Sequence, residues 1–119
     1  MEIYMQPKLS VPISSIAGQV LCEIRKLKKI NQTTVAEKLG ISVSGLSKIE
    51  TGATSLSLEQ LFLFSEIYEQ SEEEIIKKIK DIIYKLQNSG VVVTNSKSNG
   101  KKSDELHLSK SIWWLNLIE

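Results

Sequence analysis

Five stretches between about Ser14 and Leu86 alternate apolar and polar residues with helical spacing. The first runs from about Ser14 to Lys29 and has Cys22 on its polar side. At about 100° per residue its apolar side chains fall in one arc, which predicts an amphipathic helix with this buried face: Ile16, Ala17, Val20, Ile24 and Leu27.

Two short helices follow. Asn31 is a good N-cap for a helix over Gln32 to Leu39, and Ser42 is one for a helix from Val43 to about Glu50. Because only a very short turn joins the pair, we expect a fixed crossing between them. A glycine after each helix predicts its C-terminal stop: Gly40 and Gly52.

The fourth helix begins at a capping box of Ser57 and Gln60, where Leu56 and Leu61 have the spacing of a hydrophobic staple. Its predicted buried side is formed by apolar residues: Leu58, Leu61, Phe62, Phe64 and Ile67.

The fifth helix begins at a second capping box, Ser71 with Glu74. Its apolar residues are spaced like a coiled-coil seam, namely Ile75, Ile79, Ile82 and Leu86. Such a stripe is commonly the core-facing side of a last helix. Since the helix runs well past the other four, however, we interpret the seam as a dimer contact.

After residue 87 the pattern changes. Val91 to Val93 is a candidate strand, and Thr94 to Ser103 is rich in Ser, Asn, Lys and Gly, as flexible linkers are. We therefore predict a helical domain over 14–87, a linker over 88–103 and a C-terminal interaction segment over 104–119. Trp113 and Trp114 in that segment pack either on the chain itself or its dimer mate, or anchor it to a foreign protein.

Composition narrows the class of protein. A chain of 119 residues with 41% hydrophobic and 24% charged residues holds one folded domain with a tail. One cysteine, Cys22, and one histidine, His107, build neither an internal disulfide nor a zinc site. The sequence shows neither a leader nor a membrane span, so we expect a cytoplasmic protein.

Charge is distributed unevenly. The net charge of +1 argues at first against a nucleic-acid partner. It divides, however, into +3 for residues 1–50, −6 for 51–76, +6 for 77–102 and −2 for 103–119. The molecule is therefore polarised, with a basic N-terminal part and an acidic middle.

The run from Asn31 to Gly52, NQTTVAEKLGISVSGLSKIETG, resembles the phage-repressor-like (Cro/cI, XRE) helix-turn-helix family. The resemblance covers about Ile16 to Ile76 and rests on residues at fixed spacing: Gln32, Ala36, Gly40, Ser42, Ser47, Glu50 and Gly52. It implies an all-α, five-helix lambda-repressor-like DNA-binding domain, here with an extended fifth helix, a flexible linker and a short C-terminal segment.

Helix geometry indicates which face of the third helix is free. Leu46 and Ile49 mark its buried side, so the opposite side faces outward and suits a DNA major groove. The family implies that Gln32 contacts the DNA backbone. The candidate DNA-binding residues are Gln32, Thr33, Ser42, Val43, Ser44, Gly45, Ser47 and Lys48.

The resemblance also implies a structural ion pair between Arg25 and Glu50, which would remove Glu50 from base recognition. Two residues depart from the family: Gly45 lies inside the recognition helix, and Val43 stands where relatives often have glutamine. With Lys48 the only basic residue of that helix, a single domain should bind weakly and two domains should share a two-fold site.

We interpret the sequence as a homodimeric, sequence-specific DNA-binding regulator that represses transcription from a short palindrome in double-stranded DNA. It needs no cofactor or metal, and its residues assemble no catalytic group. The alternative is an antitoxin-like or anti-repressor module that binds a protein through residues 104–119.

Overall fold

Five α-helices and three short strands form the part of the chain that the computed structural model describes, residues 9–95, 106–107 and 113–118. The helices are α1 (Ile13–Leu27), α2 (Gln32–Leu39), α3 (Val43–Thr51), α4 (Leu58–Tyr68) and α5 (Glu72–Asn88). The five predicted helices are confirmed. Within the described residues, no helix has the length and apolarity needed to cross a membrane.

Side-chain caps fix where the helices begin. Asn31 Oδ1 accepts the N–H of Thr34 at 2.8 Å, and Ser42 Oγ accepts the N–H of Gly45 at 2.9 Å. Both predicted capping boxes are present, at the starts of α4 and α5. These bonds satisfy N–H groups that have no partner within the first turn of a helix.

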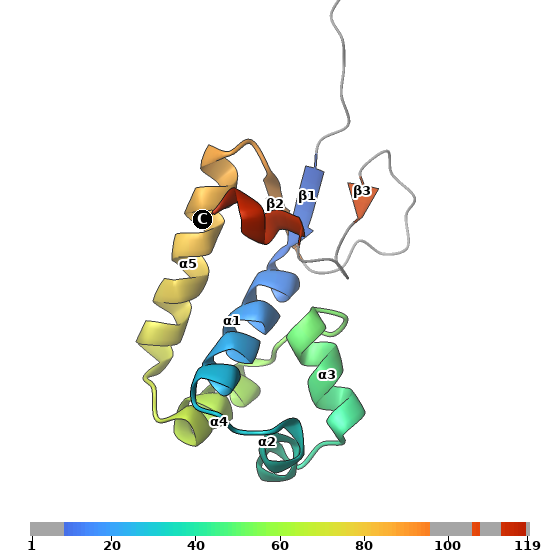
Figure 1. Cartoon of the computed structure of the whole chain (residues 1–119), viewed down its shortest axis with the longest axis vertical. Coiled ribbons are helices and arrows are strands. Elements are labelled where there is room, and N and C mark those ends of the chain that lie inside the picture. The colour runs from blue at the N-terminus through green and yellow to red at the C-terminus, as the bar shows by residue number, and fades with distance from the viewer. Residues whose placement is uncertain (1–8, 96–105, 108–112, 119) are drawn as a thin grey trace, which may run out of the picture.

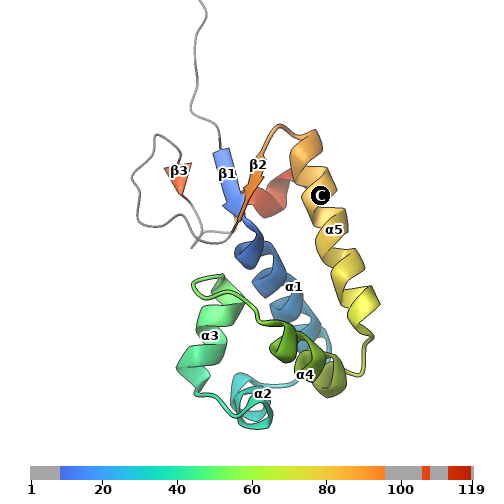
Figure 2. The same cartoon turned by 180° about the vertical axis from the view of Figure 1, so that it is seen from behind.

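Helix α1 runs through the middle of the molecule (Figure 1). It packs against α3, α4 and α5, and the view from behind shows α5 beside it and α4 at the end of the bundle that also holds α2 (Figure 2). The main core between these helices contains Val20, Leu21, Ile24, Val35, Ala36, Leu46, Ile49, Leu61, Phe64, Tyr68 and Ile75.

Three apolar residues that the pattern assigned to the core are exposed. Leu27 is 79% exposed because it is the last residue of α1, whereas Leu58 and Phe62 are 70% and 52% exposed on α4. Nearly every position of α4 is apolar, so spacing alone does not select its inner face. The structure turns Leu61, Phe64 and Tyr68 inward instead.

The strands form a small parallel sheet of order β2-β1-β3: β1 (Leu9–Pro12), β2 (Val92–Thr94) and β3 (Leu106–His107). Ser10 is aligned with Val92 in β2 and with His107 in β3. The strand expected at Val91 to Val93 is present one residue later, but β1 and β3 were not predicted. The fold is thus mostly helical, and the beginning of the expected linker is part of a sheet. Residues 96–103 of that linker lie outside the described residues.

A second core cluster lies beside the sheet. It holds Val11, Ile16, Leu86, Val91 and Trp114, and Trp114 is only 1% exposed. Trp114 belongs to a 3-10 helix, Trp113–Leu117, that packs on α5. Of the alternatives that the sequence left open for Trp114, the structure shows packing on its own chain and not on a dimer mate, because the indole is covered by residues of the second cluster. The side chain of Trp113 lies outside the described residues.

The seam of α5 is also internal. Ile75 and Leu86 are completely buried in the two clusters, and Ile79 and Ile82 are partly buried against both. The dimer role predicted for the seam is therefore wrong, because the long helix buries it against the main core at one end and the second cluster at the other.

Close approach of α1 to the end of α3 requires glycine. A Cβ at Gly18 would lie 2.2 Å from the carbonyl oxygen of Ile49 and 2.6 Å from that of Glu50. Gly52 is in the left-handed region at φ 84° and also lies against α1. A Cβ at this position would lie 2.6 Å from Ser15 Cα. Ser14 Oγ also donates to the Gly52 carbonyl at 3.0 Å. The two helices are therefore in backbone contact.

Gly18→Ala should lower the free energy of unfolding by about 3 kcal/mol, because two backbone carbonyls cannot yield to the new methyl group as a side chain would. Urea denaturation followed by circular dichroism measures this loss. Gly45→Ala is the control, since the tightest contact of a Cβ there is with the Ser42 Oγ at 3.3 Å, and the side chain of Ile41 lies at an ordinary 3.7 Å. Its free energy of unfolding should change by no more than about 1 kcal/mol. Equal effects of the two substitutions would contradict the backbone contact.

Tyr68 is completely buried, and its hydroxyl has no hydrogen-bond partner among the described residues. Tyr68→Phe should therefore raise the free energy of unfolding by about 1 kcal/mol.

Burial, with the nearby charge of Glu50, holds the pKa of Tyr68 well above its ordinary value. The folded chain thus keeps a proton that the unfolded chain loses, and stability should fall as the pH rises above about 10. Thermal melts should show a smaller alkaline loss for Tyr68→Phe than for the native chain.

Candidate nucleic-acid interface

Helices α2 and α3 are joined by a tight turn. Gly40 ends α2 in the left-handed region at φ 74°, and Ser42 already caps α3. Glycine adopts that conformation without a steric penalty. Buried Val35 and Leu46 then hold the two helices against α1 and α4 as one unit. The predicted helix-turn-helix geometry is therefore present.

The outward side of α3 is small and polar. Ser44 and Lys48 are exposed, Val43 is 41% exposed, and Ser47 is half-buried, whereas Leu46 is fully buried. Gly45 is half-buried. Ser42 is exposed, although its hydroxyl oxygen already accepts the Gly45 N–H. Among the predicted residues, Ser42, Val43, Ser44 and Lys48 are thus open to solvent, whereas Gly45 and Ser47 are partly covered.

The first turn of α2 adjoins the ion pair. Thr33 is exposed there, whereas Gln32 is half-buried and its Nε2 donates to Glu50 Oε1 at 2.9 Å. No local pattern predicts this bond, because the two residues are far apart along the chain. One N–H of the Gln32 amide is therefore directed into the protein.

The predicted ion pair of Arg25 and Glu50 is present. Arg25 Nε donates to Glu50 Oε2 at 2.7 Å and Nη2 donates to Oε1 at 3.2 Å, while the side chains are 12% and 4% exposed. Arg25 Nη1 also donates to the carbonyl of Ile30 at 3.1 Å. The hydrogen bonds to Glu50 raise the pKa of Arg25. Because Glu50 is buried and accepts from Arg25 and Gln32, it joins three helices and is not available to a base.

Cys22 lies beside this network, with Arg25 Nη2 3.8 Å from its Sγ. Burial raises the pKa of the Cys22 thiol, and the charge of Glu50 raises it further. Thiolate is the reactive form of cysteine, so this environment makes Cys22 a poor nucleophile.

The electrostatics of α3 suit an anionic partner. Its single acidic residue is the buried, paired Glu50, and its exposed side carries the ammonium of Lys48. Hydroxyl groups of Ser44 and Ser47 can donate to or accept from base edges, and the Val43 side chain can contact a thymine methyl. A helix with these properties can enter a major groove without repelling the phosphates that line it.

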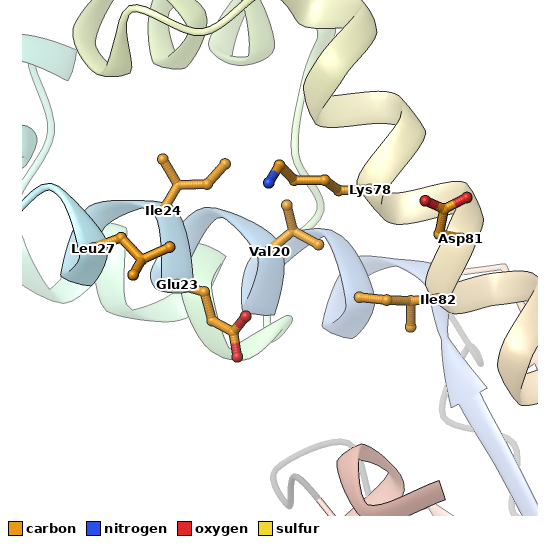
Figure 3. A pocket seen from close by; sticks show the side chains of 7 residues that line it. All are labelled: Val20, Glu23, Ile24, Leu27, Lys78, Asp81 and Ile82. Carbon is orange, nitrogen blue, oxygen red and sulfur yellow. The ribbon is translucent and has the colours of Figure 1, made fainter. Parts of the chain in front are cut away.

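Two hollows lie away from α3. One is a groove between α1 and α5 with an apolar floor and a charged rim (Figure 3), lined by Val20, Glu23, Ile24, Leu27, Lys78, Asp81 and Ile82. Its carboxylates already have partners within the chain, Gln19 for Glu23 at 3.2 Å and Lys77 for Asp81 at 3.5 Å. The other is a shallow hollow on α4 lined by Glu59, Phe62, Leu63, Glu66 and Glu72.

Arg25→Met should reduce the free energy of unfolding by about 3 kcal/mol, because it leaves the Glu50 carboxylate buried without its counter-charge. Adding Glu50→Gln removes that charge, and the double variant should recover most of the loss. Chemical denaturation of the three variants and the native chain gives the coupling free energy. Additive losses would contradict a coupled pair.

Comparisons with known proteins agree with this geometry. The helix-turn-helix family model matches residues 23–75. The chain is 22% identical to the clp gene regulator ClgR from C. glutamicum, with a TM-score of 0.56 over 58% of this chain and 90% of ClgR. It is 25% identical to a mutant of the restriction-modification controller protein C.Esp1396I, with a TM-score of 0.57 over 61% and 95% of the two chains. Comparison with curated proteins gives no match.

Proposed function

Since residues 23–75 belong to the phage-repressor-like (XRE) helix-turn-helix family and make this chain a DNA-binding regulator, we propose that it acts as a dimeric repressor on a short palindrome. The observation that carries the proposal is the outward side of α3, which is polar, free of unpaired acid and held in backbone contact with α1. Val43, Ser44, Ser47 and Lys48 of each copy would enter one major groove.

The start of α2 and the N-cap of α3 would fix the domain on the DNA backbone. Ser42, Thr33 and the second N–H of the Gln32 amide lie beside the helix N-termini, whose partial positive charge attracts phosphate. Gly45 lets the first turn of α3 approach closely. Such contacts set the register of a protein on DNA, and base contacts add the sequence preference.

Two copies are needed because each supplies few contacts. Lys48 is the only basic side chain of α3, and the net charge of the chain is +1. Nonspecific attraction to DNA should therefore be modest, and two half-sites one helical turn apart would multiply the specific contacts. Like other such regulators, the dimer would act in the cytoplasm.

The alternative of a protein-binding module gains no support from Trp114, which is 1% exposed within its own chain and so is not accessible to a partner. The side chain of Trp113, the other tryptophan of the segment, lies outside the described residues. Residues 104–105, 108–112 and 119 of that segment lie outside the described residues.

Lys48→Ala and Ser44→Ala should each weaken specific binding about ten-fold without lowering stability, because both side chains are exposed on the free chain and would contact only the DNA. Selection from random DNA would first identify the bound sequence, and fluorescence anisotropy would then measure affinity over a salt series. The matched control is Lys85→Ala, which removes an exposed lysine from α5 instead. Equal affinity for selected and random DNA would reject the proposal.

A further inference from the structure

The exposed side of α4 is apolar at its centre and acidic around it. Leu58, Phe62 and Leu63 are 70%, 52% and 38% exposed, and the carboxylates of Glu59 and Glu66 line the same hollow. Residues 51–76 contain six glutamates and no lysine or arginine. We call this surface the acidic face. Adjacent exposed apolar side chains framed by charge are typical of an interaction site on a folded domain.

The outward side of α5 has the opposite charge. Ile76 and Tyr84 are 42% and 59% exposed, and Lys80 lies between them at helical spacing, so the three form one stripe. Lys77 beside them is also exposed, but it already pairs with Asp81 at 3.5 Å, so Lys80 supplies the positive charge at the middle of this surface. We call this surface the basic face. It is distinct from the internal seam of α5, which faces the cores.

The two faces are continuous. Glu72, the first residue of α5, lines the hollow on α4, and Ile76 follows it one helical turn later. One strip of surface therefore runs from an acidic end on α4 to a basic end on α5. Apolar side chains occur along its whole length.

We propose that this strip is the surface through which two copies of the chain associate, with the acidic face of each copy on the basic face of the other. A two-fold axis between the copies makes the two strips run in opposite directions. The acidic end of each copy then lies on the basic end of the other, and the assembly closes as a dimer. The inference rests on the proposed function, because it names the contact that the dimeric repressor would use.

Charge selects this pairing over others. Two acidic faces, or two basic faces, would bring like charges together around an apolar centre, which disfavours those arrangements. In the crossed arrangement Phe62 and Leu58 of one copy would cover Ile76 and Tyr84 of the other. The apolar contact supplies affinity, and the surrounding charges fix the orientation.

Charge reversal tests the crossed arrangement without DNA. Glu66→Lys and Lys80→Glu replace exposed residues, so both variants should fold as the native chain does. Each reversal occurs twice in the dimer and should raise its dissociation constant at least about ten-fold. Sedimentation velocity over a concentration series measures that constant. Phe62→Gln should weaken the native dimer as well, because it removes the apolar centre.

An equimolar mixture of the two reversed variants is the decisive arm. A mixed pair places the two basic side chains of the Glu66→Lys variant opposite the two acidic side chains of the Lys80→Glu variant. At concentrations at which each variant alone is mainly monomeric, the mixture should therefore dimerise. Lys38→Glu is the matched control, with the same net charge as Lys80→Glu but a change on α2. It should self-associate like the native chain and should not pair preferentially with Glu66→Lys.

The outcomes separate this interface from DNA binding. A monomeric native chain, reversed variants with the native dissociation constant, or a mixture that dimerises no more tightly than either variant alone would each overturn the interface. In the DNA assay, Lys80→Glu should keep native affinity for a half-site and lose the tighter binding to the full palindrome. Equal affinity of the native chain for the selected palindrome and for random DNA would instead reject the proposed function and leave the sedimentation result standing.

Discussion

The backbone contact between α1 and the end of α3 is the constraint on which the domain depends. Gly18 allows the carbonyls of Ile49 and Glu50 to lie against α1, and the buried bonds from Arg25 to Glu50 fix the rotation of α3 about that contact. A recognition helix needs its orientation held more firmly than its surface chemistry, because a small rotation moves every groove-facing side chain. In this chain, the buried contacts of α3 with α1 set the orientation of α3, and its outward side chains take no part in it.

The ion pair does more than join two helices. Glu50 also accepts from Gln32, so the first turn of α2 is tied to the same carboxylate. The two parts of the domain that would contact DNA, the start of α2 and the outward side of α3, thus share one buried anchor. Placing a charge there is costly, but a carboxylate with several donors in good geometry keeps α1, α2 and α3 in a single arrangement.

The sequence predicted the helices well, because caps, glycines and apolar spacing are local signals. The ion pair joins residues far apart in the chain, and it was predicted only because the resemblance to a known family implies it. Prediction failed where several apolar residues compete for one face. On α4 the pattern did not separate Leu61 and Phe64, which are buried, from Leu58 and Phe62, which are exposed. The seam of α5 had the spacing of a dimer contact, but residues distant in sequence cover it. The bond from Gln32 to Glu50 and the strand β1 likewise depend on long-range contacts that no local pattern encodes.

The parallel sheet imposes an order on folding. Strand β1 precedes all five helices, yet both of its neighbours follow them, so neither strand pair forms until the whole helical region lies between its partners. Pairing of such distant segments pays a large loop-closure entropy, whereas helix contacts are mostly local. On a ribosome the helix-turn-helix would therefore fold first, and β1 would wait unpaired until residues 92 and 106 emerged. Both strand pairs of β1, and with them the second cluster, can therefore close only after the whole of residues 13–88 has been made.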